Sequence, residues 1–70
     1  MATLRKQFGQ RLREIRSERG LTQERFAEML GISVDFLSLV ERGRNAPSFE
    51  TLELLSKRLK MPVAELFTFE

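Results

Sequence analysis

Apolar side chains recur along this chain at helical spacing, and no stretch alternates between apolar and polar residues as a strand would. The first stripe repeats at i, i+4, i+8 and i+11, and it consists of Leu4, Phe8, Leu12 and Ile15. Gly20 follows, and glycine readily adopts the left-handed conformation that ends a helix. The pattern therefore predicts a first helix over about residues 3–19.

Two shorter helices are predicted next, joined by a very short connection. Thr22 is a good N-cap for the second helix. The apolar stripe of this helix consists of Phe26, Ala27 and Leu30. The connection is Gly31–Ser33, and its serine is a good N-cap for a third helix over residues 34–42, which ends at Gly43. A turn of about three residues with a glycine, between two short helices, is typical of a helix-turn-helix.

The remaining residues predict two more helices. Ser48 is a suitable N-cap for a fourth helix, and Pro62 suits the first position of a short fifth helix. Their apolar stripes consist of Leu52, Leu55 and Leu59, and of Val63, Leu66 and Phe67. The predicted fold is all-α, a compact five-helix bundle in which residues 1–70 form a single domain and about residues 22–42 form the helix-turn-helix.

The third helix separates into two faces when its residues are placed at intervals of about 100°. The inward face consists of Phe36, Leu37, Val40 and Glu41. The outward face consists of Val34, Asp35, Ser38, Leu39 and Arg42. We expect the outward face to be the working surface of this helix. The alternative is that Val34 and Leu39 are half-buried residues at the edge of the core.

Glu41 lies at the edge of the inward face, where an unpaired charge would cost free energy. Arg16 lies one residue beyond the apolar stripe of the first helix. We therefore expect a partly buried ion pair between Arg16 and Glu41 that connects the first helix to the third. The alternative is that both side chains point into water.

Composition narrows the possible functions. The 70 residues include no Cys and no His, which removes the groups that most zinc sites and nucleophilic enzymes require. A chain this short also leaves little room for a pocket, so we expect no enzyme activity, no cofactor, no metal and no small-molecule substrate. No apolar run approaches the roughly 18 residues of a membrane span, and no signal peptide is visible. A cytoplasmic location without a membrane partner is expected.

Positive charge is concentrated in the first helix. The formal net charge is +2, but residues 1–20 contain six basic and two acidic side chains. Such a segment could face a polyanion. It could also be a solvated helix face with charges paired at i,i+4 spacing, and composition alone favours this second interpretation.

Taken together, the motifs resemble a known family. The runs LTQERFAEMLGIS, VERGRNAPSFETLELLSKRL and MPVAELF are similar, in this order and spacing, to the phage-repressor and Cro type (XRE-like) of helix-turn-helix DNA-binding domain. The resemblance covers about residues 5–67. It implies a sequence-specific transcriptional regulator, similar in size to small phage repressors and restriction–modification controller proteins. It also implies a homodimer that binds a palindromic or near-palindromic operator in double-stranded DNA, with the third helix in the major groove.

The resemblance also implies roles for individual positions. The base-reading positions are Val34, Asp35, Ser38, Leu39 and Arg42. The positions beside DNA phosphates are Thr22, Gln23, Arg44, Asn45 and Ser48, of which Gln23 also braces the third helix. The buried ion pair of the family falls on Arg16 and Glu41, in agreement with the pair expected from the two helical faces.

The reading positions depart from the family pattern. Related domains often carry Gln, Lys or Arg there, whereas this chain has Val34 and Leu39, which can only contact a thymine methyl group or exclude water. We therefore expect modest, thymine-biased direct readout. Arg42 or Arg44 would supply any guanine contact, and sequence-dependent DNA bending would supply the rest.

The C-terminal residues are candidates for the dimer interface, namely Met61, Val63, Leu66, Phe67 and Phe69. The alternative is that Phe67 merely closes the core and Phe69 frays. The alternative function is a protein-interaction module or an antitoxin-like, partner-binding protein on the same scaffold, with Val34 and Leu39 in a protein-facing patch.

Overall fold

The computed structural model describes residues 2–69, which contain five α-helices and no strand. The helices are α1 (Leu4–Glu18), α2 (Gln23–Leu30), α3 (Val34–Glu41), α4 (Phe49–Leu59) and α5 (Val63–Leu66). The all-α, five-helix prediction is therefore confirmed. The single domain proposed for residues 1–70 also includes Met1 and Glu70, which lie outside the described residues. Within residues 2–69, every helix is too short or too polar to cross a membrane.

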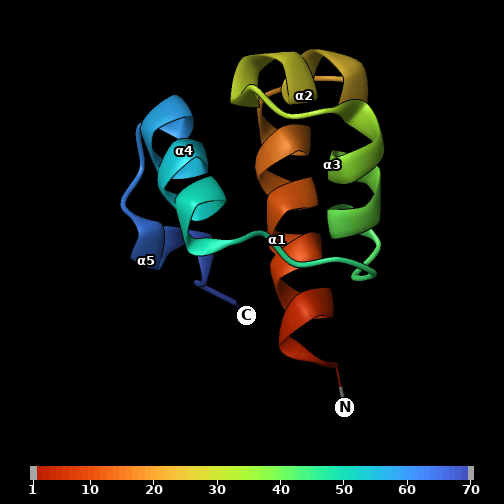
Figure 1. Ribbon diagram of the computed structural model, residues 1–70, viewed down its shortest axis with the longest axis vertical. Coiled ribbons are helices and arrows are strands. Elements are labelled where there is room, and N and C mark those ends of the chain that lie inside the picture. The colour runs from red at the N-terminus through yellow and green to blue at the C-terminus, as the bar shows by residue number, and fades with distance from the viewer. Residues whose placement is uncertain (1, 70) are drawn as a thin grey trace.

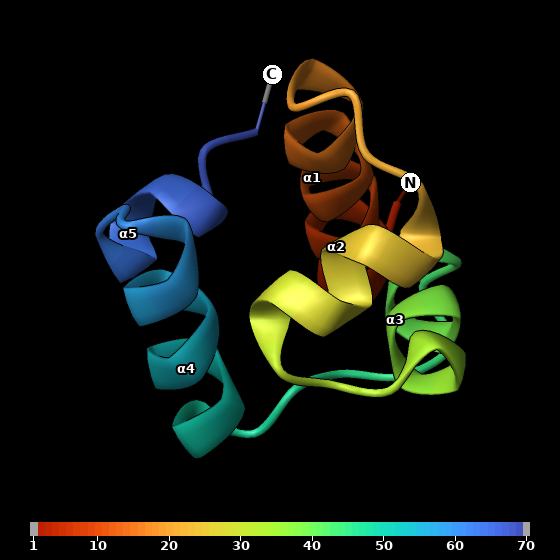
Figure 2. The same cartoon turned by 90° about the horizontal axis from the view of Figure 1, so that it is seen from above.

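The longest helix, α1, forms the centre of the bundle (Figure 1). It packs against α3 on one side and α5 on the other, while α2 lies across one end and contacts both α3 and α4. Seen from above, α4 and α5 lie on the opposite side of α1 and α2 from α3 (Figure 2). This arrangement leaves the outward face of α3 at the surface.

Side-chain hydroxyl groups cap the first four helices. In α3, the Oγ atom of Ser33 accepts a hydrogen bond from the backbone N of Phe36 at 3.1 Å. The same arrangement occurs at Thr3, Thr22 and Ser48. Each hydroxyl satisfies a backbone N–H that has no partner inside its helix, so these residues define where the helices begin.

Residues in the left-handed conformation end several of the helices, and one of these residues was not expected. Gly20 and Gly43 have φ values of +65° and +73°, the left-handed conformation expected after α1 and α3. Lys60 ends α4 in the same conformation, with φ of +56°, although it is not a glycine. Pro62 was expected at the first position of α5, but it is the N-cap, so the helix begins one residue later at Val63.

In the described part of the chain, the core consists of twelve buried apolar side chains, which are Phe8, Leu12, Ile15, Phe26, Ala27, Leu30, Leu37, Val40, Leu52, Leu55, Leu59 and Leu66. Leu4 is missing from this set, although its spacing placed it on the apolar stripe of α1. It is 61% exposed. The N-terminal turn of α1 extends beyond the neighbouring helices, so no element covers this position (Figure 1).

The backbones of α1 and α3 come into contact at Gly9. A Cβ atom at this position would lie 2.2 Å from the carbonyl oxygen of Val40 and 2.8 Å from that of Glu41. These are backbone atoms that cannot rotate away as a side chain can, so only glycine permits this approach. Gly9 therefore sets the distance between α1 and the C-terminal half of α3.

Candidate nucleic-acid interface

The connection between α2 and α3 is Gly31–Ser33, as expected. Gly31 has φ of +76°, and its backbone N donates a hydrogen bond to the carbonyl oxygen of Ala27 at 2.9 Å. The backbone N of Ile32 donates to the same oxygen at 3.1 Å, and its side chain packs against the core. Local hydrogen bonds and one apolar anchor thus determine the direction in which α3 leaves α2.

The exposure of the α3 side chains follows the two expected faces. The inward residues are buried at Leu37, Val40 and Glu41 and half-buried at Phe36. The outward residues are exposed at Val34, Asp35 and Arg42 and half-buried at Ser38 and Leu39. Val34 keeps 38% of its surface exposed. Leu39 therefore fits the edge position of the alternative interpretation, whereas Val34 is accessible.

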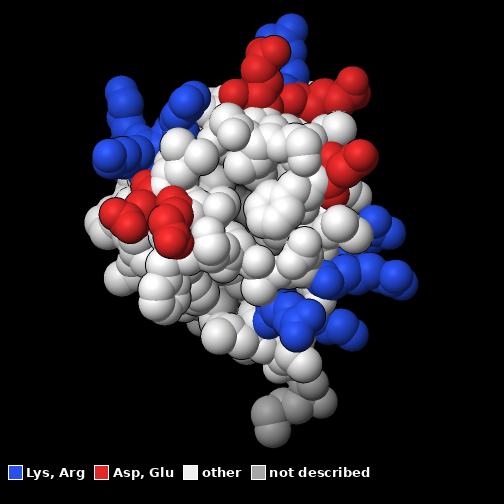
Figure 3. Space-filling model, in the orientation of Figure 1, with Lys and Arg blue, Asp and Glu red and all other residues white. Residues whose placement is uncertain are grey.

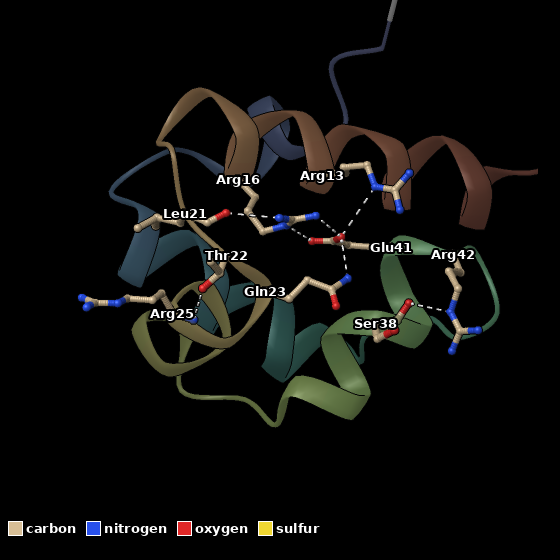
Figure 4. A network of polar contacts seen from close by, with 9 residues as sticks. All are labelled: Arg13, Arg16, Leu21, Thr22, Gln23, Arg25, Ser38, Glu41 and Arg42. Atoms are coloured by element: carbon tan, nitrogen blue, oxygen red, sulfur yellow. Dashed lines mark hydrogen bonds and ion pairs between the residues drawn. The ribbon is translucent and has the colours of Figure 1, made fainter.

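The carboxylate of Glu41 is the centre of a polar network (Figure 4). Its Oε2 accepts a hydrogen bond from Arg16 Nε at 2.8 Å, and its Oε1 accepts one from Arg16 Nη2 at 3.0 Å. Oε1 also accepts from Gln23 Nε2 at 3.0 Å and lies 3.7 Å from Arg13 Nε. The Glu41 side chain has 0% of its surface exposed, so these contacts replace the water that a carboxylate would otherwise require.

Arg16 extends this network to the backbone between α1 and α2. Besides its two-point contact with Glu41, it donates from Nη1 to the carbonyl oxygen of Leu21 at 3.1 Å. The hydrogen bonds that Arg16 donates to Glu41, with a smaller contribution from the charge of Glu41, raise the pKa of Arg16 above its ordinary value despite the opposing effect of burial. The expected pair between Arg16 and Glu41 is thus present, and it joins three parts of the chain.

Gln23 is the first residue of α2, and its amide nitrogen contacts Glu41 as described. This nitrogen carries two N–H groups, so one N–H remains for a second acceptor. Thr22, which precedes it, is exposed and caps α2 by accepting a hydrogen bond from the backbone N of Arg25 at 3.2 Å. The N-terminus of α2 is therefore held beside α3 by the same carboxylate that holds α3 to α1.

The loop between α3 and α4 carries three more of the expected residues. Arg44 and Asn45 are exposed, and the Oδ1 atom of Asn45 accepts a hydrogen bond from the backbone N of Ala46 at 2.9 Å. Ser48 is also exposed, at the N-terminus of α4. Before this loop, Arg42 donates from Nε to the carbonyl oxygen of Ser38 at 3.3 Å, which directs its guanidinium group along α3 (Figure 4).

The candidate dimer residues do not all lie at the surface. Leu66 has no exposed surface and belongs to the core, so its assignment to an interface is wrong. The reason is that α5 is a single turn, and Leu66 is the residue of this turn that faces the bundle. The ring of Phe67 packs against that of Phe8, with 5.0 Å between the ring centroids, and the ring of Phe69 lies edge-on to that of Phe67, with 6.2 Å between their centroids. Met61 is half-buried, whereas Val63 is 38% exposed.

Several arginine side chains donate hydrogen bonds to backbone carbonyl groups, which the sequence pattern did not indicate. Arg11 donates to the carbonyl oxygen of Glu65, Arg19 to that of Leu59 and Arg58 to that of Met29, at 3.0, 3.0 and 3.2 Å. These arginines satisfy carbonyl groups at or near helix C-termini, where cations are favoured. The contact of Arg13 with Glu41 was also missed, although its spacing of three residues from Arg16 puts both on one face of α1.

Two exposed apolar side chains were likewise missed. Phe49 is 82% exposed at the start of α4, and Leu4 is 61% exposed at the start of α1. Both line a cavity of about 620 Å³ whose walls also include Phe8, Pro47 and Phe67. No sequence signal distinguished Phe49, because it follows the cap residue and fits the pattern of the helix.

Comparison with known proteins identifies this arrangement. A family model described as "Helix-turn-helix" (HTH_3) matches residues 12–66. The chain is 47% identical over 57 residues to the HTH-type transcriptional regulator DdrOP3 of Deinococcus deserti, which covers 81% of this chain and 44% of that protein. It is 37% identical over 59 residues to the cryptic phage CTXphi transcriptional repressor RstR of Vibrio cholerae, which covers 84% of this chain and 53% of that protein. The chain thus spans about half the length of these relatives.

A solved structure agrees over nearly its whole length. The restriction-modification controller protein C.AhdI from Aeromonas hydrophila has a TM-score of 0.81 and 37% sequence identity, covering 89% of this chain and 94% of that chain. The expected resemblance to phage repressors and controller proteins is therefore confirmed. On the family match and on the fold, this chain belongs to the HTH_3 family of helix-turn-helix proteins.

Proposed function

We propose that this chain is a sequence-specific DNA-binding transcriptional regulator that places α3 in the major groove of double-stranded DNA. The observation that carries the proposal is the outward face of α3, which is held rigidly by the Glu41 network at its inward side. A preorganised helix loses little conformational freedom on binding, so its contacts contribute more fully to affinity. The family relationship supports the same function, since the relatives described above are named as transcriptional regulators.

Base recognition is proposed for Val34, Asp35, Ser38, Leu39 and Arg42. The exposure of Val34 supports a contact with a thymine methyl group, and Leu39 contributes from the edge of the same face. The position of Arg42 after the last turn of α3, with its Nε held by the Ser38 carbonyl, leaves the rest of its guanidinium group for guanine or phosphate. Direct readout is thus modest, and sequence-dependent DNA bending supplies the remaining specificity.

Phosphate contacts are proposed for Thr22, Gln23, Arg44, Asn45 and Ser48. Thr22 and Ser48 lie at the N-termini of α2 and α4, where backbone N–H groups and the helix dipole favour an anion. The side chain of Gln23 is already fixed by its hydrogen bond to Glu41, and the second N–H of its amide nitrogen is available to donate to a phosphate. Such contacts position the protein on the duplex without reading its sequence.

A DNA-binding assay across salt concentrations tests this function. The affinity for duplex DNA should fall steeply as salt rises, because each neutralised phosphate releases counterions. Arg44→Ala should weaken binding to all sequences alike and lower the slope of log K against log salt by about 1. Binding that is absent, or insensitive to salt, would reject DNA as the partner.

Selection of binding sites from random duplexes tests the thymine contacts. The parent should enrich thymine at the positions facing Val34 and Leu39, and Leu39→Gln should shift the preference toward adenine, which glutamine contacts with two hydrogen bonds. A parent without thymine preference, together with an unchanged Leu39→Gln profile, would contradict this reading of α3.

We further propose that the chain acts as a homodimer on a palindromic operator, with its two recognition helices about 34 Å apart. Its own concentration would then control occupancy. Apolar side chains near the C-terminal end of the chain support this interface, because Val63 is 38% exposed there and the half-buried rings of Phe67 and Phe69 contact each other. Accessible apolar side chains that lie together on a surface often mark association sites.

Sedimentation of two matched variants locates this interface. Phe69→Ser removes a half-buried aromatic ring among the candidate residues and should shift the population toward monomer, while Phe49→Ser removes an exposed ring beside the proposed phosphate contact Ser48 and should leave the population unchanged. Dissociation by Phe49→Ser alone would move the interface to the start of α4. A parent that sediments as a monomer at all concentrations would reject the homodimer.

A further inference from the structure

A cavity of about 480 Å³, lined by polar and charged residues, lies between α1 and α3, beside the proposed DNA face. Its walls carry three cationic side chains, Lys6, Arg13 and Arg42, and two carboxylates, Glu14 and Glu41. Glu41 is buried and its charge is already compensated by the two hydrogen bonds from Arg16. The cavity therefore presents three positive charges against the single uncompensated carboxylate of Glu14.

Arg13 and Lys6 differ from the arginines that support the fold. Arg11, Arg19 and Arg58 each donate to a backbone carbonyl oxygen, whereas among residues 2–69 the one ion pair of Arg13 is with Glu41, at 3.7 Å, and 59% of its side chain is exposed. Within residues 2–69, Lys6 has no carboxylate at ion-pair distance. These two cations are thus free to bind an anion.

The positions of both residues relate the cavity to the proposed phosphate contacts. Arg13 and Gln23 share one carboxylate oxygen, Glu41 Oε1, so a phosphate held by Gln23 is within reach of the Arg13 guanidinium group. Lys6 packs against Gly43, where an added Cβ atom would lie 2.6 Å from its Cγ atom. Its stem therefore follows the start of the loop that carries Arg44.

The surface charges agree with this placement. In Figure 3, one group of Lys and Arg side chains lies along the lower right edge of the molecule, and the nearest Asp and Glu side chains on that edge lie above it. A phosphodiester strand carries one negative charge per nucleotide, so it gains most where cations are adjacent and least where carboxylates are. The strand is therefore favoured along the C-terminal half of α3 and its loop.

We propose that the cavity between α1 and α3 receives a DNA phosphate that Arg13 and Lys6 bind directly, which makes α1 a DNA-contacting helix alongside α2, α3 and the loop after α3. This inference rests on the proposed function and adds two contacts to it. Glu14 opposes the phosphate, so it moderates the affinity of the same site.

The test measures binding of a short synthetic duplex of mixed sequence over about 50 to 200 mM salt, where phosphate contacts dominate. The variants are Arg13→Gln, Lys6→Gln and Glu14→Gln. Lys57→Gln is the control, because it removes the same charge from an exposed position in the last turn of α4, at the opposite end of that helix from Ser48. Melting curves of each variant separate loss of folding from loss of binding.

Arg13→Gln and Lys6→Gln should each lower the salt slope by about 1, and Lys57→Gln should leave it unchanged. Glu14→Gln should tighten binding by about two- to threefold, the effect of one charge across roughly 8 Å of water. A gain of affinity cannot arise from unfolding, and Lys6 does not touch Glu41, so these two variants remain informative if Arg13→Gln is unstable.

Two different results would overturn the proposal. A parent with a steep salt slope, combined with parental slopes in Arg13→Gln and Lys6→Gln, removes α1 from the interface and leaves the proposed function intact. A parent that shows no salt-dependent binding to DNA rejects both the proposed function and this inference.

Discussion

Gly9→Ala has two opposing effects on stability, a gain in helix propensity and a clash between α1 and the backbone of α3. Alanine is favoured over glycine in a helix interior by about 1 kcal/mol, so helix propensity alone predicts a more stable protein. Gly9 is buried in the middle of α1, where an added Cβ atom would lie 2.2 Å from the carbonyl oxygen of Val40. Since Cβ atoms essentially never approach other atoms closer than 3.0 Å, α1 and α3 must separate by roughly 1 Å.

The cost of this separation should exceed the gain in helix propensity. Overpacking a core costs about 1–3 kcal/mol, and the upper end applies here because the obstacle is backbone. The net loss in the free energy of unfolding is then about 2 kcal/mol. For a domain of this size, that lowers the melting temperature by about 8–16 °C. Thermal unfolding followed by circular dichroism measures the change.

A second glycine supplies the control. Gly20 has no atom within 4 Å of an added Cβ, and its φ of +65° is the only obstacle to alanine. Gly20→Ala should therefore cost only about 1 kcal/mol of backbone strain. If Gly9→Ala melts at or above the parent temperature, the backbone contact between α1 and α3 does not restrict this position to glycine.

The same substitution should also affect DNA binding by the folded fraction. A binding site tolerates displacements of about 0.5 Å, and the shift expected for α3 is roughly twice that. At a temperature where both proteins are folded, Gly9→Ala should bind DNA more weakly than Gly20→Ala. Equal affinities would indicate that α1 moves rather than α3.

Three further predictions concern individual contacts and are checked by denaturant unfolding. Arg16→Ala leaves the carboxylate of Glu41 buried without its main partner, and it should cost about 3 kcal/mol, while an unchanged midpoint would show that the pair contributes nothing. Lys60→Gly removes the strain of a left-handed non-glycine residue and should stabilise the protein by about 1 kcal/mol, with a loss of stability as the contrary result. Ser33→Ala removes the cap of α3 and should lower the free energy of unfolding by about 1 kcal/mol, whereas Ser33→Asp should keep most of the parent stability, because Asp is also a good N-cap.

Local chemistry explains why the helices were predictable from the sequence. Thr22, Ser33 and Ser48 cap their helices through hydrogen bonds that span only three residues. Gly20 and Gly43 end helices because their own backbones adopt positive φ. The exception is Lys60, whose left-handed conformation is unfavourable for a residue with a side chain, so no local preference indicated it.

The candidate site was predictable where helical periodicity decides which side chains face inward. The two faces of α3 and the pairing of Glu41 with Arg16 follow from angles around a helix and from the cost of burying a lone charge. Periodicity does not show where a neighbouring helix stops. Leu4 was therefore expected in the core but is exposed, and Leu66 was expected at an interface but is buried.

The sequence by itself determined the five helices, the short turn before α3 and the division of α3 into an inward and an outward face, because each depends on residues a few positions apart. Only the tertiary structure decided how the cations are used, since Arg11, Arg19 and Arg58 bind carbonyl groups distant in sequence, whereas Arg13 and Lys6 line the cavity between α1 and α3. It also decided the role of Gly9, whose constraint comes from the backbone of another helix. Periodicity carries no information about such contacts, because they depend on how the helices pack.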